Sequence, residues 1–559
     1  MAMIDRISPP VETRRTRRLA LVASLVAAVT IPLAGLPAHA QDKVVRSFKV
    51  GTGLNSAGVL PGGNDEEPSG PSAIYAAPDG KLYVLDQVNG RVISMDPNSP
   101  GTGSVKTLEL PEGLKPTDLV ATSAGLFVWD GQVHALEAAK SDTPTEKVEA
   151  RAVASVDDVT RSAFAQMGSQ APASDEELLD AAAGRSLTPD ALQAPVKQFL
   201  SSRGLGAVTI DVIPQKSVKT AVVELRQQSD PLNVTRFAIE VTDRVGSIEV
   251  LEVSAKGEVF VFVENVPTNT KQKAATYVAR YTPKGKLDKI YDLPISPDQA
   301  STRRSVTISE KGNVFFLKSD TSAVNIVDLA ARPATGQVLK PAPVKVASAD
   351  LGDDFDDAGL IAAVRPSTRS AVIQIGLAFE AFKWNLTPAN YGADPDSSCS
   401  GFSRIRRPWY LQGKAGQQVR GVPYCWGCFG TLAQFQRKVE RGVLAGNVCT
   451  RDDPRRDVAG VDCSAFVSAT WGLSRHFTTR DIPGITQELG NPWDLKPGDA
   501  LNKAGSHVML FVRFTPDRKA EVLEAATGGC NGRVCRNVYP LSTLLARGYR
   551  PVRYPALTD

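Results

Sequence analysis

The sequence predicts a multidomain protein: an N-terminal all-β, propeller-like domain with a helical insertion, followed by an α+β domain. Its 559 residues exceed what a single hydrophobic core usually holds. Through much of the first 350 residues, short β-forming runs follow glycine-containing turns, which is typical of repeated β units. All seven cysteines lie in the last third, so the two ends of the chain are built differently.

Residues 1–40 have the pattern of a secretory signal peptide. A cluster of arginines precedes an apolar stretch from Leu19 to Leu36, and Ala38-His39-Ala40 forms a small-x-small cleavage site. Pro32 interrupts the stretch, which makes a retained membrane helix the weaker alternative. Thr16 to Leu21 matches a twin-arginine signal only in part, so both export routes stay open. We expect export to the periplasm, cell envelope or extracellular space, with no stable transmembrane segment after signal removal.

Residues 41–350 are predicted to form the propeller-like domain. Glycines at positions 80, 125, 257 and 312 each precede a β-rich run, such as Lys81-Leu82-Tyr83-Val84-Leu85. The first two of their spacings, 45, 132 and 55 residues, fit a period of about 44 residues, which is typical of propeller blades. Ring closure would remove exposed sheet edges. An irregular β-sandwich is the alternative that this imperfect period leaves open.

One stretch matches a blade more closely than the others. Gly70 to Asp96 resembles one blade of an NHL-type or similar β-propeller. We expect the propeller to bind cell wall, a partner protein or a peptide. The period breaks at about residues 155–205, where Asp157, Asp175 and Pro189 begin short helix-like segments. We expect a helical insertion between blades there, with no chemistry of its own.

Residues 351–394 are predicted to be a linker and an interdomain helix. The acidic, glycine-containing stretch from Asp350 to Ala358 suits a linker. Pro366-Ser367-Thr368 then caps a helix that ends near Trp384. Apolar side chains recur on one face of this helix, which favours core or interdomain packing: Ala371, Val372, Ile375, Ala378, Phe379 and Phe382.

The cysteines predict three disulfides and one free thiol. Disulfides form in oxidising compartments, and an odd number leaves one cysteine unpaired. We expect Cys463 to be free because its surroundings suit a nucleophile. The alternative, half of a zinc site at Cys425-x-x-Cys428, is weaker because no second such pair follows, and no metal or cofactor is expected. The disulfide candidates are Cys399, Cys425, Cys428, Cys449, Cys530 and Cys535, of which the last two are close enough to pair locally.

Cys463 is predicted to open a helix. Asp462 is a good N-cap for a helix over Ser464 to Leu473, and N–H groups at a helix N-terminus stabilise a thiolate. His507 enters a strand-like run further along the chain, and a thiol with an imidazole makes a nucleophile–base pair. A buried structural cysteine and a packed strand histidine are the alternatives. The helix is expected to bury Phe466, Val467 and Trp471.

Three segments of the last third resemble the NlpC/P60 family of papain-like cysteine peptidases. In order, they are Pro423 to Gly427, Val461 to Val467, and Leu495 to Leu510. The resemblance implies a papain-like (NlpC/P60) domain over residues 395–559. It also implies that Cys463 is the catalytic nucleophile and His507 the catalytic base.

The resemblance assigns supporting residues as well. Glu524 aligns with the polar residue that orients the imidazole, and Glu521 competes for that role. Tyr424 would line the cleft and assist the oxyanion. Asp462 and Ser464 would engage the N-terminal end of the substrate.

Several features fall outside the family pattern, including Cys428 where a second glycine is common. Ala465 stands where glycine is usual, which leaves the substrate open. His476 matches nothing in the motif and is predicted to be a solvated cation after the helix.

Charge and motifs together predict a function. Residues 391–559 carry a net charge of +8 and residues 1–390 a net −4, which suits an anionic polymer such as cell wall better than nucleic acid. A merely soluble basic face explains the charge equally well. We expect an exported cysteine hydrolase that cleaves an amide in peptidoglycan stem peptides, of the γ-D-glutamyl–diamino acid endopeptidase type, with a propeller for wall or protein binding. Two alternatives stay open: a secreted propeller scaffold with an inactive papain-like domain, and an amidase or acyltransferase with a non-wall substrate.

Overall fold

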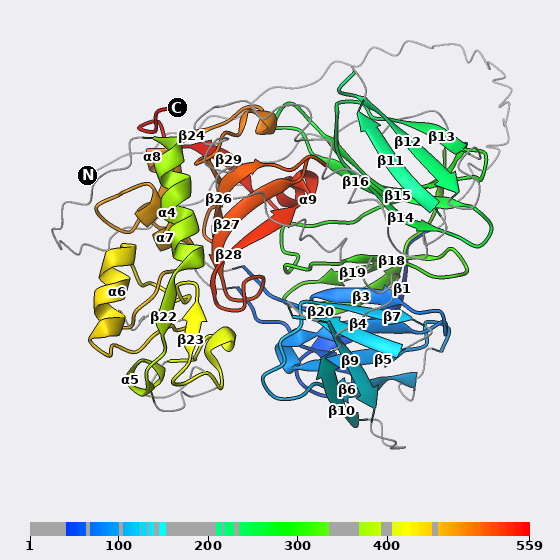
Figure 1. The fold of residues 1–559 in the computed structure, drawn as a ribbon. Helices are drawn as coiled ribbons and strands as arrows, with labels where there is room; N and C mark the ends of the chain where they lie inside the picture. Colours follow the sequence, from blue (N-terminus) through cyan, green and yellow to red (C-terminus); the bar gives the residue numbers. More distant parts are fainter. Residues whose placement is uncertain are drawn as a thin grey trace, which may run out of the picture. The chain divides into compact units, whose positions relative to one another are not determined.

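The described residues form a mostly β structure of several sheets with few helices, within one compact unit, Ala40–Asp559 (Figure 1). The computed structural model describes residues 41–559 except 63–66, 100–103, 123–124, 131–132, 139–144, 153–207, 215–216, 228–233, 335–367, 393–404 and 450–456. The predicted signal peptide, the helical insertion and the linker at 351–367 therefore lie outside the described residues, as does Cys399. Within the described residues, no helix has the length and apolar character needed to cross a membrane.

The first part of this unit consists of mostly antiparallel sheets, in which most neighbouring strands are consecutive in the chain. Parallel pairing of β6 with β10 joins the first two sheets, whose strands are β3 (Ala73–Ala76), β4 (Leu82–Asp86), β5 (Arg91–Met95), β6 (Lys106–Glu109), β7 (Asp118–Thr122), β8 (Gly125–Trp129), β9 (Val133–Ala138) and β10 (Thr145–Ala152). The next two sheets comprise β11 (Val208–Pro214), β12 (Thr220–Gln227) and β13 (Val234–Glu240), then β14 (Arg244–Val253), β15 (Val259–Val266), β16 (Ala275–Tyr281), β17 (Leu287–Asp292) and β21 (Arg332–Pro333).

The last sheet of this part is completed by the first strand of the chain. Strand β1 pairs antiparallel with β20, in a sheet of β18 (Val306–Ile308), β19 (Val314–Ser319), β20 (Ala323–Asp328), β1 (Lys43–Val50) and β2 (Ser56–Ala57). Strand β3 contacts both β7 and β18, and β14 also contacts β18. Consecutive small antiparallel sheets, the last completed by the N-terminal strand, are typical of a β-propeller. The propeller-like prediction is confirmed at this level.

The turn glycines lie where the sequence predicts them. Gly80, Gly257 and Gly312 have φ angles of +81°, +74° and +80°, and they precede β4, β15 and β19. Residues other than glycine rarely adopt this left-handed backbone conformation. Gly125 is itself the first residue of β8.

The C-terminal part is an α+β unit around a six-stranded sheet of order β24-β29-β25-β26-β27-β28. Its strands are β24 (Gln487–Glu488), β25 (Ala500–Lys503), β26 (His507–Phe514), β27 (Ala520–Ala526), β28 (Arg533–Tyr539) and β29 (Arg550–Arg553), and β22 (Lys383–Asn385) pairs separately with β23 (Gln418–Arg420). Its helices are α4 (Arg369–Ala381), α5 (Pro388–Tyr391), α6 (Leu432–Glu440), α7 (Cys463–Thr470), α8 (Ile482–Ile485) and α9 (Leu541–Ala546). Short 3-10 helices span Gln87–Asn89, Trp409–Leu411 and Pro492–Asp494.

Helix α4 forms where the sequence predicts it, capped by the side chain of Thr368. It packs on α7, β27 and β28, so its apolar face belongs to the core of the C-terminal part. Val372 and Phe379 are buried as expected. Ile373 and Leu377, which were not on the predicted face, are buried too, because α7, β27 and β28 together cover a wider stripe of the helix.

The alternation of side chains along β26 separates two cores. Val508 and Leu510 pack in the cluster that contains α4 and α7. Met509 and Phe511 pack in a second cluster with α9, which also contains side chains of the propeller. Since successive side chains of a strand point to opposite faces, His507 shares the face of Met509.

Buried polar contacts also join the propeller to the C-terminal part. Glu264 of β15 is fully buried and accepts hydrogen bonds from the backbone N–H groups of Ser542 (2.7 Å) and Ser247 (2.8 Å). The hydroxyls of Thr276 and Ser542 lie 2.7 Å apart. A carboxylate buried in this way is unfavourable without hydrogen-bond donors. These contacts therefore hold β15 and β16 of the propeller in one position against α9.

Candidate active site

Helix α7 places Cys463 at its first turn. Asp462 is the N-cap, and its Oδ1 accepts a hydrogen bond from Ala465 N at 2.7 Å. The Oδ2 of the same carboxylate accepts one from Gly427 N at 2.9 Å, which ties the loop after Tyr424 to the helix. Phe466, Val467 and Trp471 are buried, as predicted. The helix N-terminus is therefore held from several sides.

The cysteines divide as the sequence predicts among the described residues. Cys425 pairs with Cys428, and Cys530 pairs with Cys535. Cys449 is also in a disulfide. Cys463 is the free cysteine of the described part, and it is buried. Cys425 and Cys428 therefore have the disulfide that the sequence favours over the zinc alternative.

His507 and Glu524 form a buried pair across neighbouring strands. The Nε2 atom of His507 lies 2.6 Å from Glu524 Oε2. The other carboxylate oxygen of Glu524 accepts hydrogen bonds from Asn537 Nδ2 and Tyr539 OH, each at 2.7 Å. A histidine held by a carboxylate in this way has a fixed ring orientation and tautomer.

This pairing shifts both pKa values. Burial alone would lower the pKa of His507, but the hydrogen bond and negative charge of Glu524 outweigh burial and raise it. Burial would raise the pKa of Glu524, but His507, Asn537 and Tyr539 outweigh burial and lower it. Both shifts favour an imidazolium–carboxylate ion pair.

Glu521 does not reach His507 in this structure. Its carboxylate lies 2.7 Å from Arg513 Nε and 3.8 Å from Arg536 Nη1. Of the two glutamates considered from the sequence, Glu524 is the one that contacts the imidazole. Strand alternation explains the partners of Glu524, because Asn537 and Tyr539 lie at alternate positions of the adjacent strand β28.

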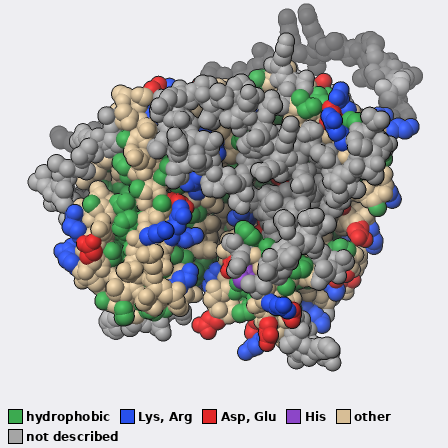
Figure 2. All heavy atoms as spheres, viewed as in Figure 1, with side chains coloured by type: hydrophobic (Ala, Val, Ile, Leu, Met, Phe, Trp, Pro, Cys, Tyr) green, Lys and Arg blue, Asp and Glu red, His purple; other side chains and the backbone are tan. Residues whose placement is uncertain are grey.

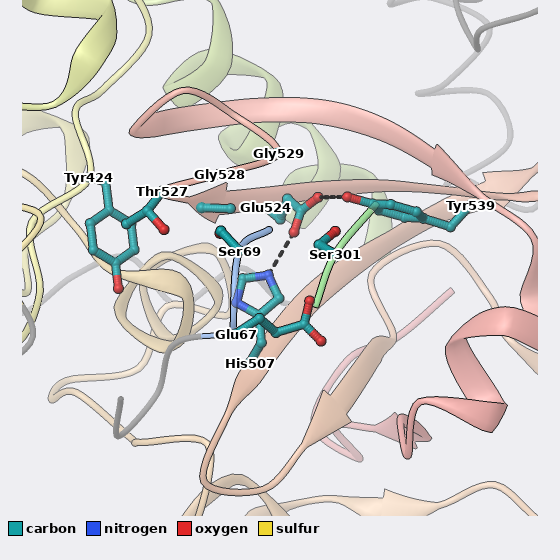
Figure 3. Close-up of a pocket in the computed structure, with 11 residues that line it drawn as sticks. Glu67, Ser69, Ser301, Tyr424, His507, Glu524, Thr527, Gly528, Gly529 and Tyr539 are labelled. Atoms are coloured by element: carbon teal, nitrogen blue, oxygen red, sulfur yellow. Dashed lines mark hydrogen bonds and ion pairs between the residues drawn. The ribbon is translucent and has the colours of Figure 1, made fainter. Parts of the chain in front are cut away.

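A pocket lies against this pair (Figure 3). Tyr424, His507 and Glu524 line it together with residues that the sequence did not indicate: Glu67, Ser69, Ser301, Ala526, Thr527, Gly528, Gly529 and Tyr539. Its cavity volume is about 20 Å³, room for about one water molecule. Tyr424 lines the pocket and belongs to a segment that pairs with Val461, two residues before Cys463. The N-terminus of α7 is therefore next to a strand segment that reaches the pocket.

Asp462 and Ser464 belong to an internal network with His476. The Oγ atom of Ser464 lies 3.0 Å from Asp462 Oδ1 and 2.7 Å from His476 Nε2. Asp462 and Ser464 are 1% and 0% exposed, so their predicted contact with substrate stays a prediction. Burial alone would raise the pKa of Asp462, but the charge and hydrogen bond of His476 and the N-cap bond outweigh burial and lower it.

The prediction for His476 was wrong. Its Nε2 atom also lies 3.3 Å from Asp462 Oδ1, and its ring stacks on Phe429 at a centroid distance of 6.2 Å. The side chain is 21% exposed and contacts Ser464 and Asp462, so it is not the solvated side chain that the sequence predicts. The chain returns to the helix N-terminus after the helix ends, and no local sequence signal marks that return.

Charged side chains on the face drawn in Figure 2 do not form a single basic surface among the described residues. Lys and Arg side chains stand in several separate groups, some with acidic side chains beside them. Among the described residues, no group of three or more His, Cys, Asp or Glu side chains is placed to hold a metal ion.

Comparisons with known proteins add little. No protein-family model matches the chain, and a search of curated proteins finds no match. Among solved structures, the chain is similar to streptogramin B lyase at 9% identity, covering 51% of this chain and 97% of that one, with a TM-score of 0.20. It is also similar to Kuenenia stuttgartiensis hydrazine synthase at 10% identity, covering 48% and 80% of the two chains, with a TM-score of 0.18. TM-scores this low do not establish a shared fold. The propeller-like description therefore rests on the order of the sheets, and the NlpC/P60 resemblance stays a prediction.

Proposed function

We propose that this chain is an exported cysteine hydrolase that cleaves an amide bond in peptidoglycan stem peptides. The observation that carries the proposal is the buried His507–Glu524 pair beside a pocket, with a free cysteine opening a nearby helix. The substrate class and the γ-D-glutamyl–diamino acid bond come from the resemblance of the three motifs. Export comes from the signal-like first 40 residues, and a disulfide-forming compartment agrees with it.

In this proposal each residue has one role. The thiolate of Cys463 adds to the amide carbonyl, and the imidazolium of His507 gives its proton to the leaving amine. Water then attacks the thioester, with His507 as base, and releases the acid and the thiolate. Glu524 orients the imidazole, while Cys463 N–H and Tyr424 assist the oxyanion.

The pairing of Cys463 with His507 is itself part of the proposal. Cys463 packs in the cluster on the α7 side of β26, whereas His507 shares the opposite strand face with Met509. His507 is the first residue of β26, so the two side chains would meet around the end of the strand. What supports the pairing is that Tyr424 lines the pocket with His507 and also pairs with Val461, two residues before Cys463.

The test is turnover of isolated muropeptides, with the products identified by mass spectrometry. We expect Cys463→Ala to reduce cleavage to the uncatalysed background. The matched control is Ser468→Ala on the same helix, which removes a buried side-chain atom without touching the proposed nucleophile and should keep cleaving. Undiminished cleavage by folded Cys463→Ala protein would refute the proposal.

One observation favours a second candidate, a secreted propeller scaffold with an inactive C-terminal domain. Cys463 is 0% exposed, and a nucleophile has to reach its substrate. Thiol alkylation separates the two candidates. A Cys463 that reacts with iodoacetamide faster than a free cysteine at neutral pH supports the enzyme, whereas an inert thiol supports the scaffold.

A further inference from the structure

A loop closed by a disulfide lies against the candidate site. Cys530 and Cys535 are bonded to each other, and they close a loop between β27 and β28. Residues 527–529, which lead into this loop, line the pocket beside Glu524 (Figure 3). The position of the loop therefore bears on the surroundings of that carboxylate.

One side of the loop reaches Glu524. Cys535 is directly opposite Glu524 in the pairing of β28 with β27. The side-chain nitrogen of Asn537 donates to Glu524 Oε1 at 2.7 Å. The same nitrogen lies 3.5 Å from Cys530 Sγ and 3.3 Å from Cys535 Sγ. Asn537 therefore lies between the disulfide and the carboxylate that holds His507.

The other side of the loop reaches Tyr424. The carbonyl oxygen of Gly532 accepts a hydrogen bond from Tyr424 N at 2.8 Å. Tyr424 in turn pairs with Val461, two residues before Cys463. The loop thus connects the segment next to Cys463 with the carboxylate of Glu524.

The disulfide restrains the end of the loop that the sheet does not hold. Cys535 is fixed by strand pairing, whereas Cys530 lies beyond Ala526, the last residue of β27. A cross-link restricts the conformations that such a loop can adopt. Without it, turn hydrogen bonds such as Asn531 N to Gly528 O, at 3.1 Å, would hold the loop. Cys535 is partly exposed, so a reductant can reach the disulfide.

We propose that the Cys530–Cys535 loop is a redox-sensitive positioning element of this site, with Asn537 as the positioning residue toward Glu524. A dithiol reductant supplies two electrons and two protons, becomes a disulfide itself, and leaves the two cysteines as thiols. The loop then releases Asn537 and Tyr424, and the carboxylate loses its fixed orientation. The effect on turnover rests on the proposed function, whereas the effect on the loop does not.

The test measures the ion pair and the loop without turnover. The proton between His507 and Glu524 lies in a short charge-assisted hydrogen bond, so it should resonate far downfield in proton NMR spectra, and His507→Asn assigns it. Hydrogen exchange followed by mass spectrometry reports the bond from Tyr424 N to Gly532 O. On reduction, we expect the downfield signal to vanish and exchange at Tyr424 to become about tenfold faster or more.

A double variant separates this disulfide from the others. Cys530→Ser with Cys535→Ser should show both changes without reductant and should not respond to reductant as the parent does. A folded double variant that keeps the downfield signal and the slow exchange of the parent would overturn the inference. A double variant in which reductant causes the same two changes would overturn it too.

Asn537→Ala covers the case in which the double variant fails to fold. It keeps the disulfide but removes the link to Glu524, so we expect the His507 signal to weaken while exchange at Tyr424 stays slow. Gln487→Ala is the matched control, because it removes an exposed side-chain amide from β24 at the edge of the same sheet. Equal His507 signals in the two variants would overturn the inference.

Turnover separates this inference from the proposed function. A cysteine nucleophile acts as a thiolate, so a reductant that affected Cys463 alone would preserve activity. We instead expect the reduced protein to cleave muropeptides at least about tenfold more slowly than the oxidised protein. Equal cleavage by both forms would overturn the inference and leave the hydrolase in place. Persistent cleavage by Cys463→Ala would overturn the proposed nucleophile, and the NMR and exchange results would still decide the role of the loop.

Discussion

Replacing Glu524 with glutamine should destabilise the C-terminal part in a pH-dependent way. The amide keeps the shape of the side chain but removes the negative charge from the 2.6 Å contact with His507. Hydrogen bonds to charged groups contribute about 1.5–3 kcal/mol each. We therefore expect a loss in unfolding free energy of about 1.5–3 kcal/mol where the ion pair exists.

The pH window follows from the directions of the two shifts. The pKa of His507 is raised, so its contribution is fully present below its unfolded pKa and is lost as pH rises through the folded value. The pKa of Glu524 is lowered, so its contribution is present above its unfolded pKa and is lost as pH falls through the folded value. The loss in Glu524→Gln should therefore be largest near pH of about 5.5 and smaller in alkaline buffer.

Urea unfolding followed by tryptophan fluorescence measures this loss, because five of the six tryptophans lie between residues 384 and 493. The matched control is Glu521→Gln on the same strand. Glu521 pairs with Arg513, and an arginine stays charged over the whole range, so the control should lose the same stability at both pH values. A Glu524→Gln loss that does not change with pH, or a control that changes as much, would refute the ion pair.

Two further predictions concern the surroundings of the site. His476→Ala should lower the unfolding free energy by about 1 kcal/mol because Ser464 and Asp462 lose a hydrogen-bond partner. Alkylation of Cys463 should show whether the helix N-terminus also loosens, and unchanged stability would contradict the network. Gly528→Ala should cost about 1–3 kcal/mol by overpacking against Ser69, whereas Gly484→Ala, which meets no atom within 4 Å, should not destabilise the protein, and equal thermal midpoints for the two variants would speak against the close fit.

Local signals account for the parts of the fold that were predicted. Helix α7 begins at Cys463 because the Asp462 side chain can satisfy an N–H group of its first turn, and this information lies within four residues. The turn glycines before β4, β15 and β19 are equally local. The Cys530–Cys535 disulfide closes a short loop, so its pairing was readable from spacing.

The unpredicted parts depend on contacts between distant residues. Ser69 and Ser301 reach the pocket only through the packing of the propeller on the C-terminal part, and nothing in their own neighbourhoods marks them. Glu67 forms an ion pair with Arg547, which lies near the other end of the sequence. His476 returns to the helix N-terminus through a turn that no motif describes. The residues of the sequence motifs were therefore predictable, whereas the residues that surround them in the structure were not.

The pairing of β1 with β20 has a consequence for how the protein reaches its folded state. Chains are made from the N-terminus, so β1 emerges first, but its partner strand becomes available only after almost all of the propeller has been made. Contacts between residues this far apart form late because a long loop must close first. Until then β1 and β20 each present an unpaired edge to other chains. We expect folding of the propeller to be limited by this last closure, and aggregation to compete with it most strongly at that step.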